Sequence, residues 1–296
     1  MAKQTDTTQT GTTEARGEYE EARKRKDLFS RILSIDRRIL YAAVLLMTII
    51  PLLQPFGLPM RVDPLTQKYY DAIESLPAGS YVLVSNGNEP GAWGEVGPFS
   101  ISTYAHLFRK HLKHVTVMFY RAEAQSMLDT MILPKVDKMD AKYGQDYVVI
   151  GFVPGAETAM AAFANDPKYP VKDAYGAMLA DLPLMKNIKT VKDFALVIGL
   201  GSVVFEVRQI TGPNKLPYIV AAMTPSLPEY MVYYNSGMIQ GIIRGIIGAA
   251  EYEFLLKLPG RAIKSNDVLS LIQMFLIAMV VVTNIVYFVS RRKGGK

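Results

Sequence analysis

The chain has 296 residues, of which 50% are hydrophobic and 20% are charged, and its formal net charge is +6. This length allows one substantial domain with additional segments, and the apolar content is typical of a globular domain that also carries membrane segments. The absence of cysteine excludes a disulfide framework, a thiol nucleophile and a zinc–thiolate site.

The positive charge is concentrated near the two ends of the chain. Seven Lys or Arg residues lie between positions 23 and 38, and four lie among the last six residues. Both groups flank apolar runs, so they indicate membrane topology rather than a nucleic-acid-binding surface. We therefore expect no nucleic-acid partner.

Residues 1–38 are predicted to form a cytoplasmic basic tail. Its first part, to about residue 26, is rich in Thr, Gln, Glu and basic residues and has no apolar periodicity, which is typical of disorder. The following segment DLFSRILSIDRRIL alternates apolar and basic residues at helical spacing. This pattern favours an amphipathic helix at a membrane surface.

Residues 39–60 form the first predicted transmembrane helix. They carry no charge over 22 residues, and at about 1.5 Å per residue they can cross a hydrocarbon core of about 30 Å. A cleaved signal peptide is disfavoured, because the preceding basic region is very long and no small-x-small cleavage site follows.

Residues 61–265 are predicted to form an α/β domain, because helical patterns alternate with short apolar runs rich in Val and Ile. Such runs are typical of strands in a parallel sheet that is covered on both faces. The expected fold is a three-layer, Rossmann-like sandwich with a mostly parallel sheet of about five strands. The sequence does not set the strand order. The predicted strands are Tyr81–Gly87, Val115–Tyr120, Asp146–Phe152, Phe194–Leu200 and Tyr218–Met223.

Three histidines, His106, His111 and His114, lie in one predicted helix and at its exit. Their spacings of five and three differ from the four-residue spacing that zinc-binding helices favour, so we expect no metal site. A solvated basic face, shared with neighbouring Lys and Arg residues, is the expected role.

Small and hydroxyl residues are common where the predicted strands end, and this is where ligands bind in open α/β sheets. They fit a small polar or anionic ligand held by backbone N–H groups, but ordinary turn and cap chemistry uses the same residue types. The candidate ligand-binding residues are Ser85, Asn86, Gly87, Gly155, Glu157, Ser202 and Thr224.

Known nucleotide-binding and catalytic motifs do not fit the chain. The segment GLGSVV begins like a dinucleotide-binding loop, but Val204 occupies the third glycine position. Neither a phosphate-binding loop nor a nucleophile elbow occurs in the sequence. We therefore expect no cofactor and do not favour an enzyme.

The segment YYNSGMIQGIIRGIIGAAEYE, Tyr233–Glu253, combines isoleucines with regularly spaced glycines. One arginine in its middle disfavours a membrane span. We predict one helix with a stripe of small residues for close packing. The stripe packs on the domain's own sheet, docks a partner or second copy, or holds a ligand through a buried Arg244 that needs an acceptor such as Glu251. The predicted packing residues are Gly237, Gly241, Arg244, Gly245, Gly248 and Glu251.

Residues 266–290 form the second predicted transmembrane helix, with Asn266 or Asp267 as its N-cap, and residues 291–296 form a second basic tail. Eleven basic residues lie outside the two spans and five lie on their inner flanks. The positive-inside rule then predicts two spans in the plasma membrane, both termini in the cytoplasm and an extracytoplasmic domain.

Three segments, LPAGSYVLVS, YGQDYVVIGFVPGAE and SGMIQGIIRGIIGAAEYE, together with the two-span frame, resemble a family of membrane-anchored α/β proteins of prokaryotes. The resemblance covers roughly residues 60–290. It implies the same architecture but no activity, so it assigns no catalytic residue.

These observations predict a non-catalytic assembly or scaffold subunit of a membrane complex. Its expected partners are the lipid bilayer and either copies of itself or other membrane proteins. The alternative is a domain that binds or turns over a small polar or anionic ligand at the strand ends. That alternative requires the side chains of Asn86, Glu157, Ser202 and Thr224 to converge on one cleft.

Overall fold

The computed structural model describes residues 36–201 and 204–294. They belong to two units, of which Pro55–Asp267 forms the α/β unit. The other unit contains helix α2 (Arg37–Leu53) and the part of helix α11 (Arg261–Gly294) that begins at Val268. Most of the amphipathic helix predicted before α2 lies outside the described residues.

The α/β unit is built on a parallel sheet of six strands in the order β3-β2-β1-β4-β5-β6. The α/β fold with a parallel sheet is therefore confirmed, and all five predicted strands are present within a few residues of their expected bounds. The sixth strand, β6, was missed. The strands are β1 (Tyr81–Asn86), β2 (Lys113–Met118), β3 (Tyr147–Phe152), β4 (Leu196–Gly201), β5 (Tyr218–Ala222) and β6 (Gly241–Arg244).

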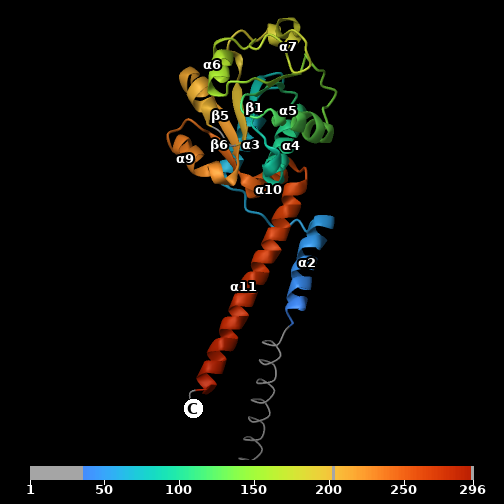
Figure 1. The fold of residues 1–296 in the computed structure, drawn as a ribbon, viewed down its shortest axis with the longest axis vertical. Coiled ribbons are helices and arrows are strands. Elements are labelled where there is room, and N and C mark those ends of the chain that lie inside the picture. Colours follow the sequence, from blue (N-terminus) through green and yellow to red (C-terminus); the bar gives the residue numbers. More distant parts are fainter. Residues whose placement is uncertain (1–35, 202–203, 295–296) are drawn as a thin grey trace, which may run out of the picture. The chain divides into compact units, whose positions relative to one another are not determined.

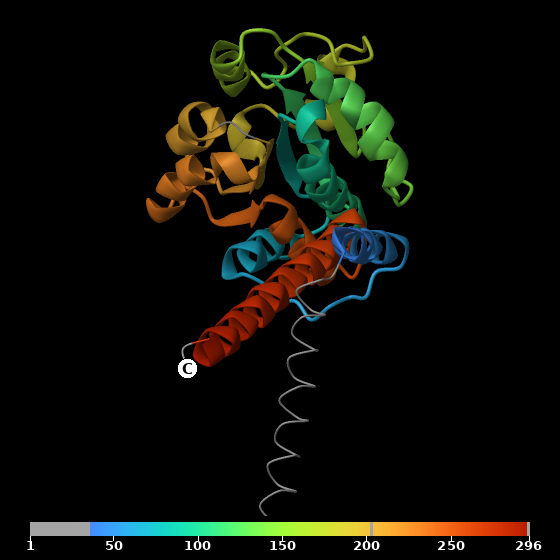
Figure 2. The same ribbon diagram turned by 60° about the horizontal axis from the view of Figure 1, so that its bottom comes forward.

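Helices cover both faces of the sheet (Figures 1 and 2). Alternate strand residues point to opposite faces, so Val82 and Val84 of β1 join one core while Leu83 joins the other. The first core is covered by α3 (Pro64–Glu74), α4 (Trp93–Arg109), α5 (Glu123–Met127) and α10 (Gly245–Leu256). The second is covered by α6 (Glu157–Asn165), α7 (Pro183–Lys186) and α9 (Leu227–Asn235). A short helix, α8 (Gly212–Asn214), precedes β5.

The glycine-rich segment does not form the single helix that the sequence predicts. Helix α9 ends at Asn235, strand β6 follows, and α10 begins at Gly245. The two isoleucines of β6 are fully buried and extend the sheet beside β5. Burying these β-branched residues in the sheet outweighs the helical spacing of the glycines.

Glycine at position 241 allows α3 to lie against the edge strand. A Cβ atom there would overlap the backbone nitrogen of Tyr69. A glycine in a strand that another backbone approaches closely is a recognised use of this residue. Gly241 therefore packs within its own domain, as one of the predicted alternatives proposes.

Among the described residues, one helix is long and apolar enough to cross a membrane, the Arg261–Phe288 part of α11. Helix α2 has 17 residues, carries Pro51 in its last turn and ends at Leu53. A continuous helix through residue 60 was therefore wrong, because residues 54–60 are not helical and include two further prolines. The structure thus supports one candidate span rather than two.

The two points where the chain enters and leaves the α/β unit are joined by one carboxylate. Asp267, which is 1% exposed, accepts backbone N–H groups from Phe56, Gly57 and Leu58 at 2.8, 3.0 and 3.2 Å. Three charge-assisted hydrogen bonds fix this connection. The segment before α3 and the first turns of α11 are consequently held together.

Candidate functional site

The strand order places a topological switch point between β1 and β4. Chain connections from these neighbouring strands run in opposite directions along the sheet. Ligands of open α/β proteins bind outside the carboxyl ends of the strands at such a point. Of the candidate residues that the sequence singled out, Ser85 and Asn86 are the last two residues of β1, and the other described ones follow β1, β3 or β5 at this edge. Ser202, which follows β4, lies outside the described residues.

The backbones of β1 and β4 touch where the two strands end. The N–H of Gly87 donates to the carbonyl oxygen of Leu200 at 2.7 Å. Gly201 has a φ of +130°, and a Cβ on it would lie 2.9 Å from the Gly87 carbonyl oxygen. Only glycine fits this backbone conformation and this spacing. The switch point is therefore closed at its base by backbone atoms.

Above this contact lies a buried asparagine, Asn88, that the sequence reading missed. Its backbone N–H donates to Oδ1 of Asn86 at 3.1 Å, and its Nδ2 donates to Oγ of Ser100 at 2.8 Å. Its Oδ1 atom is buried and has no hydrogen-bond partner in the described part of the chain. Because most buried polar atoms are paired, this carbonyl oxygen is available to a hydrogen-bond donor. The sequence signal that could have identified Asn88 is the segment Asn86-Gly87-Asn88 at the end of β1.

Two other candidate residues already bond to neighbouring helical segments, the first turn of α4 and the turn Val207–Thr211. Thr224 donates from its N–H and from its hydroxyl to the Glu95 carboxylate, at 2.7 and 2.6 Å. Glu157 accepts from Nε2 of Gln209 at 3.0 Å. These partners differ, and no hydrogen bond joins Asn86, Glu157 and Thr224 to one another within the described ranges. Their convergence on one cleft with Ser202 remains a prediction.

Charge at this edge is mixed. Glu89 forms an ion pair with Arg121 at 2.7 Å, and Glu157 interacts electrostatically with Arg208. Glu95 accepts hydrogen bonds from Thr224. Carboxylates and guanidinium groups are both present, so the charge of this edge does not by itself select the sign of a ligand.

Beneath the edge, Glu206 forms a buried carboxyl centre. It is 2% exposed and accepts from Ser85 Oγ at 2.5 Å and from the Tyr218 hydroxyl at 3.5 Å. Burial raises its pKa from 4.5 to about 7. Ser85, which the sequence singled out for ligand binding, thus points to an internal carboxyl group.

Glu206 lies after β4, and the sequence did not single it out as a candidate site residue. It stands at the start of a π-helical turn, Val207–Thr211, that follows β4. Such turns are frequent at functional sites. A single acidic residue in the apolar run SVVFEV was the sequence signal. The centre can gain or lose a proton near neutral pH, but its burial keeps it from contacting a molecule outside the domain.

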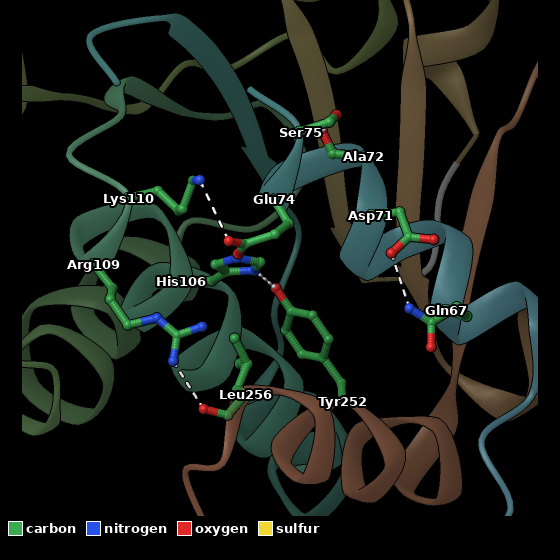
Figure 3. A network of polar contacts seen from close by, with 10 residues as sticks. All are labelled: Gln67, Asp71, Ala72, Glu74, Ser75, His106, Arg109, Lys110, Tyr252 and Leu256. Atoms are coloured by element: carbon green, nitrogen blue, oxygen red, sulfur yellow. Dashed lines mark hydrogen bonds and ion pairs between the residues drawn. The ribbon is translucent and has the colours of Figure 1, made fainter. Parts of the chain in front are cut away.

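A second polar network joins the ends of α3, α4 and α10 (Figure 3). His106 is fully buried, and its ring nitrogens lie 2.7 Å from the Tyr252 hydroxyl and 2.8 Å from Glu74 Oε2. Burial lowers the pKa of His106 to about 4, so the imidazole is neutral at pH 7. A carboxylate only accepts hydrogen bonds, so Nε2 carries the proton and Nδ1 accepts from Tyr252.

This geometry corrects the expectation of a solvated basic face. Of the three histidines, only His111 is exposed. His114 is 1% exposed, stacks on Tyr147 with ring centroids 5.8 Å apart, and has a pKa lowered to about 4 by burial. The basic neighbours Arg109, Lys110 and Lys113 are half-buried, whereas two of the three imidazoles are buried.

The remaining contacts of this network are structural. Lys110 Nζ lies 3.4 Å from Glu74 Oε1, and Arg109 Nη1 donates to the Leu256 carbonyl oxygen at 2.8 Å. The second of these bonds satisfies a carbonyl at the end of α10. Together the contacts hold three helix ends in one layer.

Arg244 is not the buried guanidinium that the sequence predicts. Its side chain is 42% exposed and forms an ion pair with Asp63. Glu251, the acceptor expected for Arg244, instead accepts the backbone N–H of Asp63 at 3.2 Å. Asp63 therefore links β6 and α10 to the start of α3, where its side chain also caps the helix.

The other predicted packing glycines serve different purposes. Gly237 lies in the turn after α9 with a φ of +80°. A Cβ on Gly245 would overlap the Glu95 carboxylate and the Thr224 hydroxyl, and one on Gly248 would lie 3.2 Å from Ile243. The tight contacts of Gly245 and Gly248 lie inside the domain, and a role in assembly remains a prediction.

Within residues 36–201 and 204–294, no group of three or more His, Asp or Glu side chains is arranged to hold a metal ion. No protein-family model matches the chain, and no curated protein matches it. The resemblance drawn from sequence segments therefore gains no support from these comparisons, and arguments about function rest on the geometry.

Proposed function

We propose that this chain is a membrane-anchored α/β protein that acts as a non-catalytic assembly subunit, with a second copy of itself as its partner. In this proposal the segments before and after the α/β unit both cross the plasma membrane. The basic tails lie in the cytoplasm and the α/β unit lies outside it. Helix α2 has 17 residues and rises about 26 Å, which is less than the hydrocarbon core of about 30 Å. In this proposal the bilayer therefore thins around α2, as it does around other short spans.

The carrying observation is an apolar row formed by Ile247 and Phe254 on α10 and by Leu258, two residues after this helix ends at Leu256. These side chains are 52%, 53% and 43% exposed. The first two are seven residues apart, so they share one face of the helix. Large exposed apolar side chains in a row are typical of an interaction surface.

The connection between this row and α11 favours a second copy as the occupant. The row ends three residues before α11 begins at Arg261, which contains the candidate span. In a membrane, every copy therefore carries the row at the same distance from the bilayer surface. Two copies related by a twofold axis can then pack identical surfaces against each other.

The absence of cysteine in the chain makes a site-specific crosslink the direct test. Phe254→Cys in native membranes should give a covalent dimer on mild oxidation. Lys192→Cys, also at an exposed position but outside α10, is the matched control and should stay monomeric. A monomer from both variants, with a monomeric mass at every protein concentration, would reject assembly.

A second function is favoured by one observation, the unpartnered Oδ1 of Asn88 at the switch point. In this alternative the carboxyl edge binds a small hydrogen-bond donor. Native mass spectrometry of the full chain purified in mild detergent tests it. A bound small molecule that is present in the wild type and lost in Asn88→Ala would support the alternative. Identical masses without any adduct would reject it.

A further inference from the structure

A half-enclosed cavity lies in the α/β unit between α4 and the connection from α10 to α11. Its volume of about 500 Å³ falls within the range of about 300–1,000 Å³ that is usual for small-molecule sites. One wall is formed by Pro98, Ile101 and Arg109 of α4, and another by residues 135–139. The third wall is residues 258–261, which lead into α11.

The lining is mainly apolar but carries three cationic side chains, Arg109, Lys135 and Arg261. It also contains two carboxylates, of which Glu253 is already engaged. Glu253 accepts backbone N–H groups from Gly260, Ala262 and Ile263 at 3.0, 3.1 and 2.9 Å. These bonds cap the start of α11 and orient Glu253 toward it. Three cations then face two carboxylates, so the lining keeps a small excess of positive charge, and the cavity favours a molecule with one anionic group and an apolar body.

The cavity also lies close to the level of lipid headgroups. Arg261 is the first residue of the helix that contains the candidate span, and the charge-free run begins seven residues later at Val268. Seven residues of α-helix rise about 10 Å. The headgroup layer extends about 5–8 Å beyond the hydrocarbon on each side. The wall that contains Arg261 is therefore at the outer border of the headgroups.

We propose that this cavity binds a phospholipid with an anionic headgroup, taken from the surrounding bilayer. Arg109 and Arg261 hold the phosphate, and part of an acyl chain packs along Pro98 and Ile101. Arg109 uses one guanidinium N–H on Leu256 and retains further donors of the five that its side chain carries. The proposal rests on α11 crossing the membrane, which is part of the proposed function.

The only tryptophan of the chain, Trp93, provides a specific reporter. Lys135, which lines the cavity, has its Nζ 5.5 Å from the centroid of the Trp93 ring. The full chain is reconstituted into phosphatidylcholine vesicles that contain a small, equal fraction of brominated phosphatidylglycerol or brominated phosphatidylcholine. We expect the brominated anionic lipid to quench Trp93 fluorescence at least twofold more strongly.

Substitutions then assign the selectivity to the cavity. The double variant Arg109→Gln/Arg261→Gln should bring the quenching by the two lipids to within about 20% of each other. Arg208→Gln, which removes a half-exposed arginine on another part of the domain, is the matched control and should retain the twofold difference. Excess inorganic phosphate should leave the difference unchanged.

Three outcomes would overturn the proposal. Equal quenching by both lipids in a wild-type chain that floats with vesicles would reject the lipid site and leave the anchor intact. Loss of the difference in added phosphate would show that the cavity takes a free anion. A chain that fails to float with vesicles would reject both the anchor and the lipid site.

Discussion

At the scale of single residues, the domain contains two buried titratable centres, Glu206 and His106, whose contacts differ in purpose. Glu206 shares hydrogen bonds with Ser85 and Tyr218 beneath the switch point. His106 instead connects the helices that carry Glu74 and Tyr252. Burial favours the neutral form of both side chains: it raises the pKa of Glu206 to about 7 and lowers the pKa of His106 to about 4. The two residues therefore change the stability of the domain with pH in opposite directions.

The carboxyl of Glu206 should make the domain less stable as the pH rises from about 4.5 to about 7. Its pKa is raised from 4.5 to about 7 in the folded state, so over this range the folded state binds the proton more tightly than the unfolded state. A tenfold change in proton affinity equals about 1.4 kcal/mol, so the full effect above pH 7 is on the order of 3 kcal/mol.

The measurement is a comparison of thermal melts of the wild type and Glu206→Gln from pH 4.5 to pH 7.5. The variant should gain stability relative to the wild type as the pH rises. The difference between the two proteins is the diagnostic quantity, because His106 and His114, with pKa values lowered to about 4, make stability rise with pH up to about 6.5. Parallel curves would show that Glu206 does not titrate in this range.

His106→Asn should destabilise the domain strongly, while His111→Asn should not. Asparagine at position 106 cannot reach both Tyr252 and Glu74, and an unsatisfied buried polar group costs about 1–3 kcal/mol. His111 is exposed and has a φ of +51°, a conformation that asparagine tolerates. Its substitution should stay within about 0.5 kcal/mol. Denaturant unfolding of both variants is the test, and equal losses would contradict the buried network.

For Arg244 and His106 the structure reverses the burial that the sequence predicted. The sequence predicted a buried Arg244, but its side chain is exposed and paired with Asp63, and exposed ion pairs contribute about 0–1 kcal/mol to stability. His106 read as a surface residue because its neighbours are basic. Its partners are 32 and 146 residues away in the sequence, so no local pattern contained the information.

At the scale of elements, the strands were predictable because they are short, apolar and bounded by turns, as buried parallel strands are. Strand β6 was not, for two reasons. It has only four residues, and the spacing of its glycine with those that follow matches a helix. Whether these residues form a strand or a helix depends on their contacts with Tyr69 of α3 and with β5, which lie elsewhere in the sequence. The strand order depends on similar long-range pairing.

Gly241→Ala should separate α3 from β6 and destabilise the domain by about 1–3 kcal/mol, the usual cost of forcing extra atoms into a packed site. The added Cβ would overlap the Tyr69 backbone. Gly94→Ala in the first turn of α4 is the matched control, because a Cβ there has nothing within 4 Å and alanine favours the helix by up to about 1 kcal/mol. Thermal melts are the test, and an unchanged melting temperature for Gly241→Ala would mean that α3 shifts without loss of stability.

At the scale of the whole molecule, the sequence predicted where five strands end, because strand ends can be read from apolar runs, and a ligand site at these ends remains a prediction. The sequence did not reveal that Thr224 and Glu157 bond to two separate helical segments, or that Ser85 bonds to Glu206. Such pairings form only after the sheet brings distant segments together. The bonds from Asp267 to residues 56–58 are a further example.

The central claim is that both flanking segments cross the membrane and leave the α/β unit on the outside. The direct measurement is labelling of single cysteines with a membrane-impermeant maleimide, because the chain has no cysteine of its own. Lys192→Cys lies in the α/β unit, whereas Lys24→Cys and Lys296→Cys lie in the two tails.

In intact cells, or in spheroplasts where an outer barrier must be removed, Lys192→Cys should react while both tail cysteines react only after the plasma membrane is permeabilised. Labelling of Lys24→Cys together with Lys192→Cys in intact cells would contradict the account, because it would leave α11 as the single span and place the first tail outside.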